Sequence, residues 1–341
     1  MKRAGIVAAV LVAMVALALA GAVQAAPKKT TGFQMGFAGF FTGNSWNVQT
    51  FTTVQRAAKA DKEIANLIVA NAETSVEKQI AQINDMIDKR VDGIVVVAAS
   101  ETAINPTIDA AMQEGIPVVA TDHNVNNDKI TSQIWVDQVK WGVVTAQWLV
   151  DKIGKKGGKI VVLNGAPGNS ANDDRWEGAK SVFDKHPEIE ILASANADWD
   201  QAKAQPIVAT WLAAYSQIDG IWSQGGAMTA AAMIEFERAG RKLVPMTGEA
   251  YNGFMKLWIK NMPKGFTSIA PVLPNFDVQI ALEVAKRAAK GEKVPKIVKV
   301  PLTIIRDDTV KQQVMMDQPD DYWPINWLPQ AKVDEIIKAS M

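Results

Sequence analysis

The 341-residue sequence predicts an α/β protein of two similar halves, each built on a parallel sheet covered by helices. Short apolar runs rich in β-branched residues, such as 91–99, alternate with helical apolar spacing, as expected of strands buried on both faces. One strand-helix-strand unit also occurs twice, because Asp92 and Asp122 are 30 positions apart, as are Asp219 and Glu249. Polar residues follow the strands of both units, and open α/β sheets bind their ligands at that edge.

Strands and helices alternate along the whole chain. The expected strands are 33–39, 64–69, 91–99, 116–120, 130–136, 160–163, 189–193, 218–221, 243–249, 266–270 and an extended stretch at 297–305. The expected helices are one after Ser45, then 76–87, 104–112, 139–153, 170–183, about 201–215, a helical segment before 243, 251–261, 275–289 and 331–339.

Local signals set several of these boundaries. Ser45 can cap the helix that follows it, Pro106 suits a first helical turn, and Gly115 and Gly291 end helices. The tail after 307 differs in composition and is rich in aromatic residues between 320 and 329. We expect these aromatics to attach the tail to the body of the protein, since Trp side chains usually pack in cores.

The amino terminus has the features of a secretory signal peptide at 1–25. Met1-Lys-Arg3 is basic, 4–23 is apolar, and small residues precede a cleavage point after Ala25. A retained membrane anchor is the alternative, because the apolar run is just long enough to span a bilayer. We expect a protein exported to the periplasm.

Charge and cysteine content exclude several classes. Without Lys2 and Arg3 the chain has 34 basic and 36 acidic residues, a balance that predicts neither a nucleic acid nor an anionic membrane as partner. The sequence contains no cysteine, so it is not a disulfide-stabilised scaffold. It also lacks paired histidines at metal spacing, a dinucleotide-binding glycine motif and a Walker-type loop, so no metal site or cofactor is expected.

Residues suited to binding hydroxyl groups follow the predicted strands. Asp122 and Glu249 end equivalent strands of the repeated unit, and Ser100 follows the strand at 91–99. Trp46 and Trp199 could cover the C–H faces of a sugar or polyol, although ordinary packing explains either of them equally well.

Two further polar residues are open to either interpretation. Asp173 is three residues after Ser170, so it could serve a capping box instead of a ligand. His123 directly follows Asp122 and could contact a ligand or play a structural role.

At these residues the chain resembles the type I periplasmic solute-binding proteins of ABC importers, in particular the ribose-binding-like group that serves sugars. The resemblance covers Phe33 to about Thr303. Its most specific parts are Val91-Asp-Gly-Ile94, Ile116-Pro-Val-Val119 with Asp122, Arg175-x-Glu177-Gly178, Ala197-Asp-Trp-Asp200 and Ile218-Asp-Gly-Ile221.

The resemblance implies two Rossmann-like lobes with parallel sheets, joined by a three-crossing hinge near Asp137, Pro271 and Thr303. The lobes would comprise 30–136 plus 272–302, and 137–271 plus 303–341 with the tail. Proteins of this family are not enzymes. They close on one ligand, deliver it to an ABC permease in the membrane, and in some cases also signal to a chemoreceptor. We expect this chain to be a monomer.

The family's contacts, transferred by position together with Ser100 from the strand-end argument, give a candidate set. It consists of Asn44, Trp46, Asn47, Ser100, Asp122, His123, Asp173, Trp199, Gly225, Glu249 and Pro271. His123 and Asp173 stand where the ribose-type pattern has arginines, Gly225 replaces an asparagine and Glu249 an aspartate. We therefore expect a site that has lost two guanidinium groups, and a neutral sugar or polyol, or an amine-bearing ligand, in place of an anion.

Two other function classes remain open at this point. A secreted hydrolase or isomerase could use the acidic cluster, and product formation from a sugar would distinguish it. A sensor ectodomain would share the two-lobed fold and would retain its membrane anchor, whereas a repressor of the lactose type would need an amino-terminal DNA-binding helix pair in place of the export signal.

Overall fold

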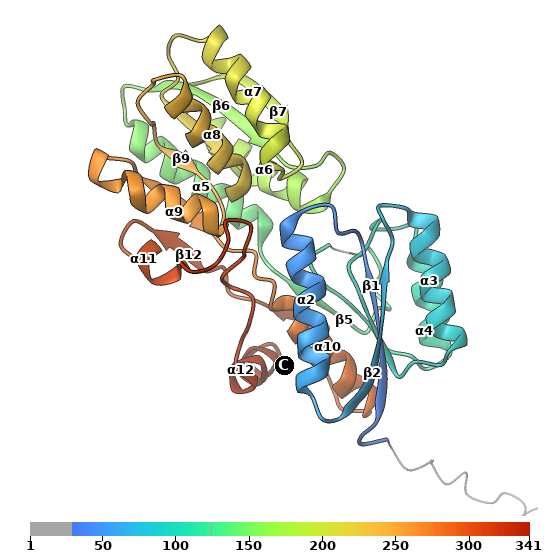
Figure 1. Cartoon of the computed structure of the whole chain (residues 1–341). Helices are drawn as coiled ribbons and strands as arrows, with labels where there is room; N and C mark the ends of the chain where they lie inside the picture. Colours follow the sequence, from blue (N-terminus) through green and yellow to red (C-terminus); the bar gives the residue numbers. More distant parts are fainter. Residues whose placement is uncertain (1–28, 124) are drawn as a thin grey trace, which may run out of the picture.

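The computed structural model describes residues 29–123 and 125–341, so the expected signal segment 1–25 lies outside the described residues. The described chain folds into two α/β lobes, each around a six-stranded sheet (Figure 1). This confirms the predicted fold class. Over the described ranges, no helix is both long enough and apolar enough to cross a membrane.

The first lobe is built on an all-parallel sheet of order β11-β5-β4-β3-β1-β2. In β3, Ile94 and Val96 pack with one helical layer, whereas Val95 and Val97 after it pack with the other, which explains the unbroken apolar run. The strands are β1 (Phe33–Gly39), β2 (Ile64–Asn71), β3 (Gly93–Val96), β4 (Val118–Ala120), β5 (Ser132–Trp135) and β11 (Ile297–Lys299). The layers are α3 (Val76–Asp88) with α4 (Asn105–Gln113), and α2 (Ser45–Ala60) with α10 (Asp277–Ala289).

The second lobe repeats this plan strand for strand, in the order β12-β10-β9-β8-β6-β7. Its edge strand β12 differs, because it runs antiparallel to β10. The strands are β6 (Gly158–Asn164), β7 (Ile189–Asn196), β8 (Gly220–Ser223), β9 (Met246–Thr247), β10 (Ser268–Pro271) and β12 (Ile304–Arg306). One face packs against α5 (Gln138–Ile153) and α6 (Ser170–Phe183), the other against α7 (Gln201–Ala214), α8 (Gly226–Arg238) and α9 (Asn252–Asn261), which a short 3₁₀ turn (Met262–Lys264) follows.

The chain passes between the lobes after β5, after β10 and between β11 and β12. Helix α5 follows a first-lobe strand but packs on the second sheet, and α10 does the reverse. Two of the crossing segments are hydrogen-bonded, since Val272 N donates to Thr303 O over 2.9 Å. These are the three crossings expected near Asp137, Pro271 and Thr303.

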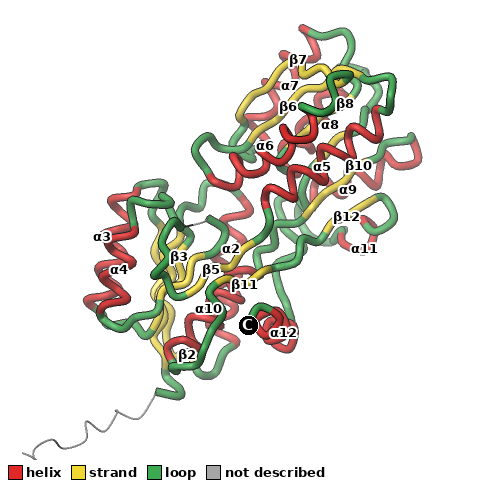
Figure 2. The backbone as a smooth tube through the Cα atoms, turned by 180° about the vertical axis from the view of Figure 1, so that it is seen from behind, coloured by secondary structure: helices red, strands yellow, loops and turns green. Residues whose placement is uncertain are grey.

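The carboxy-terminal tail contacts both lobes. Helix α11 (Val310–Gln313) packs near α9 of the second lobe, whereas α12 (Gln330–Ala339) packs against α10 and β11 of the first (Figures 1 and 2). The sequence interpretation had placed 303–341 with the second lobe alone. No local sequence signal indicated that the chain passes back to the first lobe at α12.

Two local expectations are corrected. The extended stretch at 297–305 is two strands of different sheets, because the chain changes lobe in the middle of it. Ser45 does not cap the helix after it. Asn44 is the N-cap of α2, and its Oδ1 accepts a hydrogen bond from Asn47 N over 2.9 Å.

Candidate functional site between the lobes

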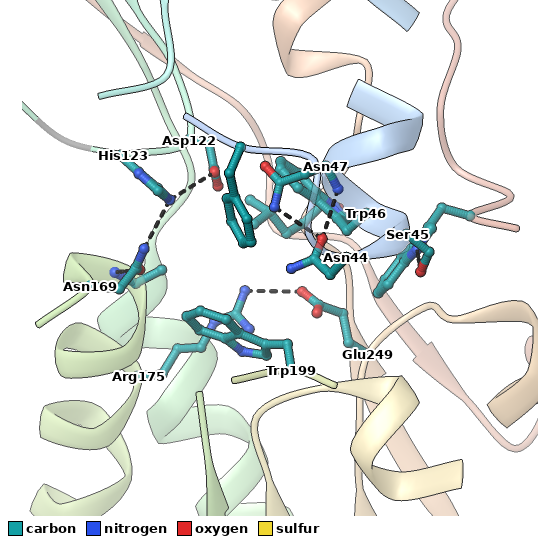
Figure 3. Close-up of a pocket in the computed structure, with 14 residues that line it drawn as sticks. Asn44, Ser45, Trp46, Asn47, Asp122, His123, Asn169, Arg175, Trp199 and Glu249 are labelled. Carbon is teal, nitrogen blue, oxygen red and sulfur yellow. Dashed lines mark hydrogen bonds and ion pairs between the residues drawn. The ribbon is translucent and has the colours of Figure 1, made fainter. Parts of the chain in front are cut away.

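Loops from both lobes meet around one cavity with an empty volume of about 530 Å³, including the part open to solvent. Asp122 and Glu249, from equivalent strand ends, both reach it (Figure 3). The cavity is lined by Phe41, Asn44, Ser45, Trp46, Asn47, Asp122, His123, Asn169, Ala171, Arg175, Trp199, Glu249, Leu273 and Trp323.

Asp122 supplies the carboxylate of the first lobe. It follows β4 with its backbone in the left-handed region (φ 65°), and its side chain is only 5% exposed. Burial raises the pKa of this carboxyl group, while the positive charge of Arg175 opposes the rise. Its Oδ2 lies 3.2 Å from Nε2 of His123. A ligand hydroxyl could therefore donate a hydrogen bond to the carboxyl group of Asp122.

His123 connects the two lobes. Its Nδ1 lies 2.7 Å from Ala98 O, so Nδ1 carries the proton that this carbonyl accepts. Its Nε2 lies 2.9 Å from Nδ2 of Asn169, the N-cap of α6 in the second lobe. The amide of Asn169 is oriented by its Oδ1, which accepts from Ala171 N, so Nδ2 donates to a neutral ring. The contact therefore exists only when the lobes are close together.

Arg175 forms the polar floor of the second lobe. Its side chain is 1% exposed, and its Nη2 donates to Oε1 of Glu249 over 2.9 Å. Nε donates to Gln138 and Nη1 to the carbonyl of Gln224, both over 2.7 Å. The guanidinium also lies 4.6 Å from the ring of Trp141. Burial raises the pKa of Glu249, and the charge of Arg175 opposes that rise.

Two indole rings lie on opposite sides of the cavity (Figure 3). Trp46, from the first lobe, donates from Nε1 to the carbonyl of Leu273 in the second crossing over 3.0 Å. Trp199, from the second lobe, rests against Gly165 and Gly225. A Cβ atom at these glycines would lie 2.1 Å and 2.7 Å from its ring. Nε1 of Trp199 is buried without a hydrogen-bond partner, so it is available to a ligand.

The structure brings together seven of the eleven candidates from the sequence: Asn44, Trp46, Asn47, Asp122, His123, Trp199 and Glu249. Ser100 lies outside the lining, because its hydroxyl accepts from the backbone N–H of Ala103 over 3.1 Å and organises the turn after β3. Asp173 also lies outside. Its Oδ1 accepts from Asn172, and the cap of α6 is Asn169, so it is not part of a capping box either.

Gly225 and Pro271 support the cavity without lining it. Gly225 is the N-cap position of α8 and leaves space for Trp199. Pro271 is buried at the end of β10 and pairs with Ile304. Neither residue contacts the cavity directly: Gly225 positions Trp199, and Pro271 is part of the sheet.

Seven lining residues are absent from the candidate set from the sequence: Phe41, Ser45, Asn169, Ala171, Arg175, Leu273 and Trp323. Arg175 corrects the expectation that the site has lost two guanidinium groups, because one does reach the cavity, paired with Glu249. Trp323 comes from the tail, whose aromatics were expected to attach it to the body in preference to contacting a ligand.

The cavity thus offers carboxylate oxygens, amide groups, a guanidinium and several aromatic faces. In the ranges 29–123 and 125–341 no group of three or more His, Cys, Asp or Glu residues could hold a metal ion. This combination suits a compact molecule with several hydroxyl groups and exposed C–H faces.

Residues 35–293 match the family model described as "Periplasmic binding protein domain". The chain is 30% identical over 233 residues to the xylitol-binding protein of Mycolicibacterium smegmatis, covering 67% of this chain and 65%, just under two thirds, of that protein. It is 24% identical to the ribose import binding protein of Bacillus subtilis, covering 80% of this chain and 87% of that protein.

Solved structures give the same picture of the fold. An ABC transporter periplasmic solute-binding protein from Actinobacillus succinogenes with bound D-allose has a TM-score of 0.71 at 27% identity, covering 82% of this chain and 99% of that chain. An ABC transporter solute-binding protein from Thermobispora bispora has a TM-score of 0.80 at 24% identity, covering 90% of this chain and 95% of that chain. At this identity the similarity concerns only the fold.

Proposed function

The chain belongs to the periplasmic binding protein domain family, and from this premise we propose that it is the extracytoplasmic substrate-binding component of an ABC importer for a monosaccharide or polyol. The observation that supports this most is the single cavity to which each lobe contributes a buried carboxylate and an indole ring. Its relatives are named for xylitol, ribose and allose, which share the polyhydroxylated character that this lining suits.

The charges in the cavity favour an uncharged ligand. Arg175 and Glu249 are paired with each other, so neither is free to neutralise a charged guest. An anionic ligand would be repelled by the carboxylates of Asp122 and Glu249. A ligand amine, in contrast, could pair with Asp122. Because burial already raises the pKa of Asp122, a neutral hydroxyl network is the better match for this carboxyl group.

Binding would use both lobes at once. Hydroxyl groups would donate to Asp122 and Glu249 and accept from the amides of the first loop, while Trp46 and Trp199 would cover the C–H faces. The ligand would favour the state in which His123 of the first lobe contacts Asn169 of the second. It would thereby shift the equilibrium toward the closed state by its preference for that state.

We further propose that residues 1–25 form a signal peptide cleaved after Ala25, so that the mature chain works as a monomer in the periplasm. It would release its unmodified ligand to a membrane permease. We propose no catalytic role for the acidic groups, which would serve as hydrogen-bond acceptors for the ligand.

A thermal-shift screen tests this proposal. Purified protein is heated with xylitol, ribose, allose or myo-inositol, and with xylonate as the anionic match of xylitol. At least one neutral compound should raise the Tm by several degrees, since a ligand at a thousand times its Kd stabilises by about 4 kcal/mol. Xylonate should give no shift.

The variants Asp122→Ala and Trp199→Ala should reduce the shift, measured from each variant's own baseline. If no neutral compound produces a shift, or if nuclear magnetic resonance shows that the bound compound is converted, the proposal fails.

A further inference from the structure

The segment 307–328, here called the strap, runs from the second lobe to the first after the last crossing. Figure 1 shows that it contains α11, beside the second lobe, and leads to α12, beside α10. It lies beyond residues 35–293, which match the family model. The fold therefore holds the lobes together with one more connection than its three hinge crossings.

The strap is firmly attached to the second lobe by one buried side chain. Asn252, at the start of α9, is 0% exposed. Its Nδ2 lies within hydrogen-bond distance of the carbonyls of Met315 (2.8 Å), Pro319 (2.9 Å) and Gln318 (3.2 Å). Its Oδ1 accepts from Met315 N over 3.0 Å. These bonds fold the strap into a fixed loop against α9.

The other end is attached to the first lobe. Gln279 of α10 donates to the carbonyl of Leu328 over 3.0 Å and accepts from its N–H over 3.1 Å. The guanidinium of Arg56 lies 3.9 Å from the ring of Trp327. The strap therefore has independent attachments on each side of the cleft.

Between these attachments, Trp323 lines the cavity. It is 6% exposed, and its Nε1 donates to Oγ of Ser45 in the first lobe over 3.0 Å. Its ring meets Tyr251 of the second lobe edge-on at a centroid distance of 5.5 Å. One indole thus contacts both lobes and the cavity.

We propose that Trp323 is a specificity-determining residue, and that the strap supplies a third indole, beside those of Trp46 and Trp199, that limits the size of the ligand the cleft admits. This inference rests on the proposed function, because it assigns a role within that same cavity. A six-carbon ring has more atoms to place against this indole than a five-carbon polyol or sugar, so we expect the indole to discriminate between the two sizes. Removal of the indole would widen the cavity on the strap side.

Isothermal titration calorimetry with xylitol, ribose, allose and myo-inositol tests the inference on the full mature chain. Trp323→Ala should weaken the tightest-binding compound at least tenfold and should change the affinity ratio between five-carbon and six-carbon compounds by a similar factor. Trp323→Phe should restore the ratio, because it retains a ring. Trp148→Ala, on α5 and outside the cavity, should leave all affinities within twofold.

A purely structural role of Trp323 would lower the Tm but leave the ratio unchanged, and that result overturns the inference. If the unmodified chain binds none of the four, the proposed function fails, and hydrogen–deuterium exchange then decides the strap's role. Trp323→Ala should speed exchange at 44–47 and at 249–252, one segment in each lobe. Faster exchange in only one of them, or in neither, would contradict the double contact.

Discussion

Substitution of Glu249 by alanine should destabilise the ligand-free protein as well as weaken binding. Glu249 is the ionic partner of Arg175, which is 1% exposed and would keep its charge after the change. Removing one partner of a buried ion pair costs about 3–5 kcal/mol. For a lobe-sized unit this lowers the Tm by roughly 10 °C.

The structure offers a matched set of variants for this prediction. Glu249→Gln keeps an acceptor for Nη2 of Arg175 and should cost less than Glu249→Ala. The double variant Arg175→Met/Glu249→Gln removes both charges, so its cost should fall below the sum of the single costs by about 1–3 kcal/mol. Arg175→Met alone should be costly, because it leaves Glu249 buried and unpaired.

Differential scanning fluorimetry of the ligand-free variants measures these differences, with chemical denaturation to convert them to free energies. A Tm for Glu249→Ala within 2 °C of the unmodified protein would show that Glu249 does not stabilise the buried charge of Arg175, as would costs that simply add in the double variant. The result also decides how binding data are interpreted, because a lower baseline must be separated from a lost ligand contact.

Three further outcomes are expected. Burial raises the pKa of Asp122, so the contribution of this residue to stability is lost as pH rises from the ordinary range of Asp through the raised pKa. Asp122→Asn should therefore weaken binding but raise the Tm of the ligand-free protein, and the rise should be larger at pH 7 than at pH 4. An equal rise in Tm at both pH values would contradict this. Gly225→Ala places a Cβ 2.7 Å from the ring of Trp199 at an extended backbone (φ −155°), so calorimetry should show at least tenfold weaker binding, and unchanged binding would show that the ring can move away at no cost. Asn169→Ser keeps the helix cap but cannot reach His123, which should weaken binding roughly fivefold, the value of one hydrogen bond of about 1 kcal/mol; affinity equal to that of the unmodified chain would mean that the contact does not favour closure.

The fold could be predicted because its signals are local. Fully apolar strands such as β3 are recognisable from their β-branched composition, and the equal spacing of Asp92–Asp122 and Asp219–Glu249 revealed the repeated unit. The same logic located Asp122 and Glu249, since the end of a parallel strand is fixed by its own sequence. Their convergence in one cavity follows from the matching order of the two sheets.

Arg175 was missed for a geometric reason. It lies two residues beyond Asp173, and two residues turn a helix by about 200°, so the two side chains face nearly opposite sides of α6. Which side faces the cavity depends on the close packing of α5 against α6. A Cβ atom at Gly142 or Gly178 would lie 2.0 Å from the backbone of the opposite helix. The Arg175-x-Glu177-Gly178 motif was the available signal.

Trp323 could not be located because the path of the tail is set by distant contacts. The attachments at Asn252 and Gln279 are 49 or more residues away in sequence from their partners in the strap. Composition predicted that the aromatics attach the tail, and for Trp327 on Arg56 this is what the structure contains. It did not predict that the same segment crosses the cleft.

Whether the cavity binds a neutral polyhydroxylated ligand without altering it can be measured by calorimetric titration of the mature chain at pH 7 with xylitol, ribose, allose and myo-inositol, followed by recovery of the bound compound. We expect one site per chain for at least one of these neutral compounds, recovery of the compound unchanged, and loss of the binding heat in Asp122→Ala. Absence of heat with all four, or recovery of an altered compound, would contradict this expectation.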